Sequence, residues 1–229
     1  MRAVVIGAKR GLGLALTNSL LAAGHSVAAG VRDRVVPESL QALSVRYGER
    51  LLVGQAEITD EREVRSFADA VAARFGRADA LCTVAGILLP GDRANTLLRC
   101  DIDEVRRTFD VNVVGPVIAA KCFYPVMEKG GKVLTVTSEG VGVHNAYPGS
   151  PAYALSKTAA TKVSGILNAT ADDVDFYSVH PGRVVTDMNP NGEISAEESA
   201  EGILGILTGK IPVSREVWYI DYRGYPMEM

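Results

Sequence analysis

The sequence predicts an α/β protein of three layers, in which a doubly wound, mainly parallel, seven-stranded sheet lies between two layers of helices. Short apolar runs alternate with longer amphipathic runs along the 229 residues, a pattern typical of parallel strands joined by helical crossovers. Several of the short runs are apolar throughout, as strands covered on both faces are. A glycine-rich loop, residues 7–13, separates the first strand from the first helix.

The elements follow one another without a linker, a repeat or a low-complexity stretch, so we expect one domain over residues 1–229. The seven strands are expected at the short apolar runs, residues 3–6, 26–31, 51–56, 80–84, 132–137, 175–180 and 217–221. The helices are expected between them, at residues 12–23, 38–47, 61–75, 103–127, 152–171 and 196–208. Ser195 with Glu198, and Asp60 with Glu63, have the spacing of a capping box, which marks the start of two of these helices.

Composition excludes several functional classes. The chain has 24 Lys and Arg against 27 Asp and Glu, a formal net charge of -3, which argues against a protein that binds nucleic acid, because polyanion binding needs clustered cations. Three cysteines, Cys82, Cys100 and Cys122, are too few for a disulfide framework and lack metal-ligand spacing. They predict reduced thiols in a cytoplasmic protein without a metal. No apolar run approaches the ~18 residues of a membrane span, so we expect no membrane association.

The loop Gly7-Ala8-Lys9-Arg10-Gly11-Leu12-Gly13 has the spacing G-x3-G-x-G. Glycine allows a sharp turn and lets backbone N–H groups approach a pyrophosphate without a Cβ in the way. The helix that follows would direct the positive end of its dipole at the phosphates. The loop therefore predicts a dinucleotide site.

Two arginines indicate which dinucleotide is bound. NAD sites place an acidic residue at the end of the second strand, where it binds the ribose 2′-hydroxyl. Here Arg32 follows Val31, and Arg10 in the glycine loop would face the same region. Guanidinium groups suit a 2′-phosphate, so we expect NADP(H) in preference to NAD(H). Asp33 keeps NAD(H) open as the alternative, because a shift of one residue would bring its carboxylate to the ribose.

A tyrosine and a lysine, Tyr153 and Lys157, lie four residues apart at the start of a predicted helix. Positions i and i+4 share one helix face, and a nearby ammonium lowers the pKa of a phenol. Such a tyrosine can exchange a proton with a carbonyl oxygen as a hydride is transferred. Ser138, at the end of the strand over residues 132–137, would face the same edge of the sheet.

The order of these residues resembles the short-chain dehydrogenase/reductase superfamily over essentially the whole chain. The motifs are the glycine loop, Asn112, Ser138, Tyr153-x3-Lys157 and Pro181-Gly182. Within the superfamily, residues 178–188, 196–200 and 218–224 resemble the C-factor/Sniffer-type carbonyl reductases. The resemblance implies the Rossmann fold.

The resemblance also implies roles. Tyr153 would be the acid/base, Lys157 would bind the nicotinamide ribose and lower the pKa of the phenol, Ser138 would bond the substrate oxygen, and Asn112 would hold a water that relays protons. These four are the expected catalytic residues. The expected cofactor-binding residues are Gly7, Lys9, Arg10, Gly11, Leu12, Gly13, Arg32, Glu57, Ile58, Ala85, Gly86, Tyr153, Lys157, Pro181, Gly182, Val184 and Thr186.

The chain departs from the family pattern at three places. Ile6 replaces the threonine usual before the first glycine, Thr83-Val84 replaces an Asn pair, and Glu57 stands where Asp is commoner. These departures concern the affinity for the cofactor and leave the four catalytic positions intact.

The expected function is hydride transfer between NADP(H) and a small or medium aldehyde, ketone or quinone, or the corresponding alcohol. The segment between Thr186 and Ser195 is short, which indicates an open site. Its pocket candidates, chosen by position only, are Leu88, Leu89, His144, Tyr147 and Met188; for His144, a solvent-exposed loop position is the alternative.

Two other functions stay open: a non-catalytic dinucleotide-sensing or signalling protein on the same fold, and an epimerase or dehydratase of a related branch. The helices over residues 103–127 and 152–171 carry apolar residues on more than one face. The corresponding helices of the superfamily often form subunit interfaces, so we expect a homodimer or homotetramer, with a monomer as the alternative.

Overall fold

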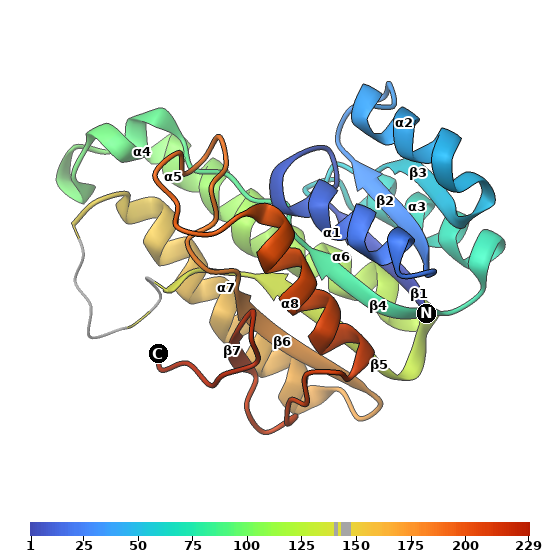
Figure 1. Cartoon of the computed structure of the whole chain (residues 1–229). Coiled ribbons are helices and arrows are strands. Elements are labelled where there is room, and N and C mark those ends of the chain that lie inside the picture. Colours follow the sequence, from blue (N-terminus) through green and yellow to red (C-terminus); the bar gives the residue numbers. More distant parts are fainter. Residues whose placement is uncertain (140–141, 143–147) are drawn as a thin grey trace.

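The computed structural model describes residues 1–139, 142 and 148–229, and its centre is one sheet of seven strands (Figure 1). The strand order is β3-β2-β1-β4-β5-β6-β7. Every pairing within this sheet is parallel, so the expected mainly parallel sheet is found, with no antiparallel member among its seven strands. The strands are β1 (Arg2–Ile6), β2 (Ser26–Val31), β3 (Leu51–Gln55), β4 (Ala78–Thr83), β5 (Met127–Val136), β6 (Val174–His180) and β7 (Tyr219–Asp221).

Helices follow the strands in alternation, as the sequence pattern predicts. They are α1 (Gly11–Ala22), α2 (Glu38–Tyr47), α3 (Glu61–Phe75), α4 (Pro90–Ala94), α5 (Ile102–Phe109), α6 (Gly115–Phe123), α7 (Pro151–Thr170) and α8 (Ala196–Thr208). Short 3-10 turns lie at Gly48–Arg50, Leu97–Arg99 and Tyr124–Val126. None of the helices in the described ranges combines the length and the apolar content that crossing a bilayer requires.

Two apolar cores lie on the two faces of the sheet, because successive strand residues point to opposite sides. Ala3 and Val5 of β1 pack in the core beneath α1, α2 and α8. Val4 and Ile6 pack in the core beneath α3 and α6. Figure 1 shows the same division, with α1, α2 and α8 on the near side of the sheet. Cys82 and Cys122 are buried in these cores with free thiols.

The helix expected over residues 103–127 is interrupted, and that prediction was wrong in its continuity. A π-helical turn, Asp110–Val114, separates α5 from α6. Pro116 explains the break, because a proline has no N–H to give to the carbonyl four residues earlier, which here belongs to Asn112. A wider turn accommodates the missing bond, and such turns occur often at functional sites. The helical stretch ends at Val126, since β5 begins at Met127.

The two helix starts expected from capping-box spacing are confirmed. The Asp60 carboxylate accepts hydrogen bonds from the backbone N–H groups of Arg62 and Glu63, and the Ser195 hydroxyl accepts one from Glu198 at 3.0 Å. The Glu63 side chain does not complete a box with Asp60. It accepts instead from the backbone N–H of Glu57 at 3.0 Å, which ties α3 to the turn after β3.

Candidate active site

Lys157 and Tyr153 lie together near the carboxyl end of β5. The Lys157 ammonium is buried and donates a hydrogen bond to the carbonyl oxygen of Val136 at 2.8 Å. The same nitrogen lies 5.6 Å from the centre of the Tyr153 ring. Ser138 follows β5 by two residues, and its main-chain carbonyl accepts a bond from the Tyr219 hydroxyl at 2.7 Å, which anchors this turn to β7. The parallel sheet thus brings together residues that the sequence separates.

Asn112 is fixed inside the π-helical turn and connects three segments. Its side-chain oxygen accepts from the Ile87 N–H at 2.8 Å, and its side-chain nitrogen donates to the Ile87 carbonyl at 2.9 Å and to the Ser156 hydroxyl at 3.0 Å. Ser156 in turn donates to the carbonyl of Tyr153 at 2.7 Å. Sequence reasoning missed Ser156, whose position between Tyr153 and Lys157 was the available signal. That Asn112 also holds a water stays a prediction.

The start of α7 is held by a residue from another helix. Ser150 precedes α7 in a left-handed conformation and makes no side-chain cap. The Asp92 carboxylate of α4 accepts instead from the backbone N–H groups of Ala152 and Tyr153, at 2.8 and 2.9 Å. Sequence reasoning assigned Asp92 no role.

Burial has the largest effect on the pKa values of Tyr153 and Lys157. Desolvation raises the pKa of the Tyr153 phenol to about 12, against a smaller lowering by Arg93. Desolvation also lowers the pKa of Lys157 to about 8. The expected lowering of the phenol's pKa by Lys157 is therefore not found, because the ammonium is bonded to Val136 and both groups are withdrawn from water. At neutral pH the phenol carries its proton and the lysine its charge, which suits a proton donor.

The burial of Lys157 predicts a dependence of stability on pH. The folded pKa lies below the ordinary value of 10.5, so between pH 8 and 10.5 the unfolded chain binds more protons than the folded one. The free energy of unfolding should therefore rise across this window, by at most ~1.4 kcal/mol per pH unit from this group. Urea unfolding of wild type and Lys157→Met at several pH values measures the difference. The exposed Lys162 on the same helix provides the control, Lys162→Met, and identical slopes for wild type and Lys157→Met would contradict the prediction.

The glycine loop forms a cradle that fits a pyrophosphate. Gly7 has φ +95°, and a Cβ there would lie 2.5 Å from the main-chain nitrogen of Ala85. A Cβ on Gly13 would lie 2.1 Å from the Gly7 carbonyl oxygen. Helix α1 begins at Gly11 without an acidic residue in its first turn and without a side-chain cap from Arg10. Free first-turn N–H groups beside a close-packed glycine turn are the donors that phosphate oxygens require.

Of the two arginines expected near the ribose, Arg10 lies elsewhere. Arg10 forms an exposed ion pair with Asp187 at 2.6 Å, in the segment after β6, and so does not face the end of β2. Lys9 takes that place, with its ammonium 2.9 Å from the Asp33 carboxylate. The Lys9 contact holds the pKa of Asp33 below its usual value. Arg32 is exposed beside them.

The remaining predicted cofactor residues divide between the site's edge and the core. Gly86 lies at the catalytic cluster, since a Cβ there would be 3.2 Å from the Lys157 ammonium and 3.3 Å from the Asn112 side-chain oxygen. The Glu57 carboxylate accepts from the Thr59 hydroxyl at 3.1 Å. Buried side chains are those of Leu12, Ile58 and Val184. Thr186 accepts the Asn189 N–H at 3.1 Å, and Gly182 has φ +82° after Pro181.

Three of the pocket candidates lie in described segments. Leu88 and Leu89 are half-buried ahead of α4, and the Met188 carbonyl accepts a bond from the Arg93 guanidinium. His144 and Tyr147 lie outside the described residues. His180 has its pKa lowered by burial and lies near Glu139.

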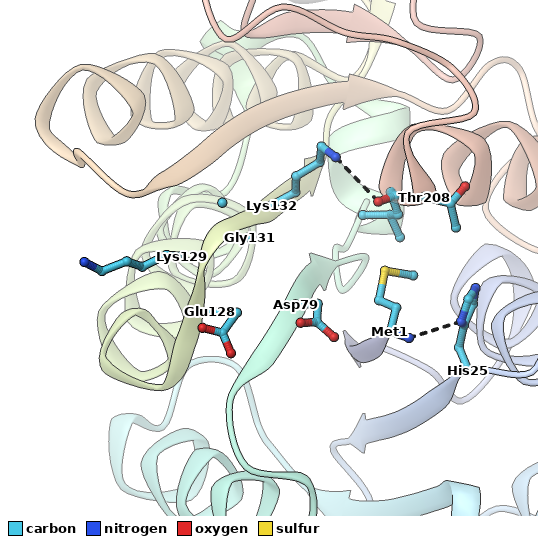
Figure 2. A pocket seen from close by; sticks show the side chains of 10 residues that line it. Met1, His25, Asp79, Glu128, Lys129, Gly131, Lys132 and Thr208 are labelled. Carbon is cyan, nitrogen blue, oxygen red and sulfur yellow. Dashed lines mark hydrogen bonds between the residues drawn. The ribbon is translucent and has the colours of Figure 1, made fainter.

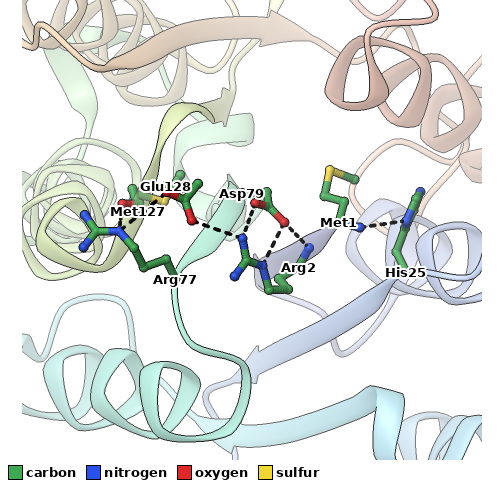
Figure 3. A network of polar contacts seen from close by, with 7 residues as sticks. All are labelled: Met1, Arg2, His25, Arg77, Asp79, Met127 and Glu128. Atoms are coloured by element: carbon green, nitrogen blue, oxygen red, sulfur yellow. Dashed lines mark hydrogen bonds and ion pairs between the residues drawn. The ribbon is translucent and has the colours of Figure 1, made fainter.

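A cavity of about 340 Å³ lies at the opposite, amino edge of the sheet (Figure 2). Its acidic lining residues Asp79 and Glu128 are both engaged by Arg2, at 2.6 and 3.3 Å (Figure 3). Arg77 donates to the Met127 carbonyl at 2.9 Å beside them. These contacts tie the starts of β1, β4 and β5 together. The cavity contains none of the predicted site residues, and we place the candidate active site at the carboxyl edge, where ligands of open parallel sheets bind.

Comparisons with known proteins find relatives along most of the chain. A family model described as short chain dehydrogenase matches residues 1–196. The chain is 30% identical over 198 residues to the short chain dehydrogenase pigC of Monascus ruber, an alignment that covers 82% of this chain and 64% of that protein. Two further relatives at 30% identity are longer still, and the chain spans 41% and 14% of their lengths.

Solved structures resemble the whole chain. A carbonyl reductase from Pseudomonas aeruginosa PAO1 aligns with a TM-score of 0.86 and 26% identity, covering 100% of this chain and 99% of that one. A short-chain dehydrogenase/reductase structure from Burkholderia multivorans with bound NADP aligns with the same score, identity and coverage. The fold is therefore shared along its full length with proteins of this kind.

Proposed function

The chain belongs to the short chain dehydrogenase family, and on this premise we propose that it is an NADP(H)-dependent reductase of small or medium aldehydes, ketones or quinones. The observation that carries the proposal is the cluster of Tyr153, Lys157 and Asn112 beside the glycine cradle. The Lys157 ammonium is bonded to the Val136 carbonyl, and the Asn112 amide is bonded to Ile87 and to Ser156, whose hydroxyl donates to the main-chain carbonyl of Tyr153. The Pseudomonas carbonyl reductase and the NADP-bound Burkholderia protein support the substrate and cofactor classes by likeness.

The side chains of the site supply the proton that the reduction of a carbonyl needs. A bound nicotinamide supplies the hydride. Tyr153 is protonated at neutral pH because its pKa is about 12, and it donates this proton to the carbonyl oxygen as negative charge develops there. Ser138 donates a hydrogen bond to the same oxygen. The Lys157 ammonium, 5.6 Å from the ring, would bind the ribose of the nicotinamide.

A turnover assay against a panel of aldehydes, ketones and quinones tests the proposal. We expect saturable NADPH oxidation with at least one class. Saturable binding of NADPH without turnover of any class would overturn the proposal and favour a dinucleotide-sensing protein. Conversion of a nucleotide-linked sugar without net change in NADPH would instead favour an epimerase or dehydratase.

The preference for NADP(H) rests on the cations near the end of β2. Lys9 neutralises Asp33 at 2.9 Å, which leaves the exposed Arg32 available to a 2′-phosphate. Arg32→Ala should raise the Kd of NADPH about tenfold or more, because hydrogen bonds to charged groups contribute ~1.5–3 kcal/mol. The Kd of NADH should stay unchanged. Fluorescence titration measures both, and the exposed Arg34 gives the control, Arg34→Ala. A parallel loss for both cofactors would contradict the assignment.

Self-association remains a prediction of the proposed function. Val114, Val117, Leu155 and Ile166 of the α6 and α7 region are exposed apolar side chains, and they support a homodimer or homotetramer over a monomer.

A further inference from the structure

Asp92 is a buried carboxylate that the proposed chemistry does not use. It belongs to α4, a short helix of the segment between β4 and α5, and its exposed fraction is 2%. Carboxylates are seldom buried to this degree unless they are paired or fully hydrogen-bonded. Here the partners are two backbone N–H groups of α7, those of Ala152 and Tyr153.

These two N–H groups belong to the first turn of the helix that carries Tyr153. The first N–H groups of a helix have no partner within it, and a carboxylate there is also favoured by the helix dipole. Helix α7 has no acidic residue in its first turn and no side-chain cap from Ser150. Asp92 supplies both functions from 60 residues away in the sequence.

The main chain of Tyr153 is held by side chains on both of its polar groups. Its N–H donates to Asp92 at 2.9 Å, and its carbonyl accepts from the Ser156 hydroxyl at 2.7 Å. Ser156 is itself bonded to Asn112. Two independent contacts therefore fix the Cα position from which the phenol extends.

Helix α4 is in turn held in place by its surroundings. A Cβ on Gly91 would lie 2.1 Å from the Glu104 carboxylate of α5, so glycine permits close packing between the two helices. On the other side of Asp92, the Arg93 guanidinium donates to the Met188 carbonyl in the segment after β6. These contacts on both sides of Asp92 therefore fix its position relative to α7.

We propose that Asp92 is a positioning residue for Tyr153, which it acts on through the main chain of α7 without touching the substrate. The inference rests on the proposed function for its catalytic consequence, and on the described contacts alone for its structural one. A displacement of about 1 Å in a reacting group is enough to lower a rate about 100-fold. The carboxylate thus sets the reach of the phenol towards a carbonyl oxygen.

The test compares Asp92→Ala and Asp92→Asn with Asp60→Ala. Asp60 is the matched control, because it also accepts from two backbone N–H groups at a helix start, in α3. Asp92→Ala should lower kcat about 10- to 100-fold and leave the Kd of NADPH within about twofold. The kcat of Asp92→Asn should lie between those of Asp92→Ala and wild type, because its amide oxygen still accepts one N–H. Asp60→Ala should lower the melting temperature with kcat nearly unchanged.

Hydrogen exchange provides a readout that needs no turnover. Amides in residues 151–157 should lose protection in Asp92→Ala, by about tenfold or more, if the carboxylate holds this turn. Unchanged protection there, or a kcat equal to that of wild type at a temperature where the variant is folded, overturns the inference. If Asp92→Ala does not fold, Asp92→Asn decides by the same two measurements. A wild type that turns over no substrate overturns the proposed function, and the exchange result then decides the positioning role separately.

Discussion

Replacing Tyr153 with phenylalanine is expected to lower kcat for carbonyl reduction by about 10²- to 10⁴-fold, the range that a positioned general acid contributes. The change removes one hydroxyl from a partly buried ring. The phenol has its pKa raised to about 12 by desolvation, so wild type holds the proton throughout the neutral range.

Cofactor binding should survive this substitution. The glycine cradle and the start of α1 are unchanged in this variant, and Phe keeps the ring beside the Lys157 ammonium. Steady-state kinetics and a fluorescence titration of NADPH measure the two effects. Tyr124→Phe is the matched control, because it removes an exposed hydroxyl that donates to Asp173 at 2.9 Å. A Tyr153→Phe variant that retains most of the wild-type kcat would exclude the proposed acid.

The alternation of strands and helices was predictable because it depends on local periodicity. The bounds expected for α2, α3 and α8 agree with the structure, since amphipathic runs with clear ends leave little choice. Helix α4 was not predicted. It has only five residues and starts at a proline, so it is too short to show a repeating hydrophobic pattern. The π-helical turn was also missed, because its cause, Pro116, lies beyond the turn itself.

Site residues that belong to a sequence motif were predictable. Site residues that are defined only by a contact in the folded structure were not. Tyr153, Lys157 and Asn112 were expected, and the structure brings them together. Asp92 was not, because its bond to the Tyr153 N–H spans 61 residues and uses the main chain, which leaves no pattern of residue types. The direction of the phenol's pKa was also wrong in the prediction. Helix spacing predicts that two groups are near, but desolvation depends on how the whole site packs.

The pairing of Arg10 illustrates the same limit for charges. The sequence places Arg10 in the glycine loop but says nothing of Asp187, 177 residues later, which binds it. Lys9 takes the position near Asp33 instead. A long charged side chain can reach several partners, so its place in a loop does not determine which group it contacts.

Gly7→Ala should have the second large effect, on both the free energy of unfolding and cofactor binding. Gly7 has φ +95°, and an added Cβ would lie 2.5 Å from the Ala85 main-chain nitrogen. Backbone cannot move aside as a flexible side chain does. The Gly7 and Ala8 N–H groups both donate to the Gly30 carbonyl, at 2.9 and 3.2 Å, so a displaced loop would also lose contacts with β2.

Gly24→Ala separates the clash from the strain of the backbone conformation. Gly24 has φ +90° in the turn between α1 and β2, and nothing lies within 4 Å of an added Cβ. Both variants carry the left-handed penalty of about 1–2 kcal/mol, and only Gly7→Ala carries the overlap with Ala85. We expect urea unfolding to show Gly7→Ala less stable by at least about 2 kcal/mol beyond Gly24→Ala.

The same pair of variants tests whether the loop is the phosphate cradle. NADPH should bind to Gly24→Ala as to wild type, and its Kd for Gly7→Ala should rise about 100-fold, because the first N–H groups of α1 lose their alignment when the turn shifts. Titration below the melting temperature of each variant isolates binding from unfolding. If Gly7→Ala is folded and binds NADPH as tightly as Gly24→Ala does, the dinucleotide does not use this loop, and the anion-binding role of the α1 start is excluded.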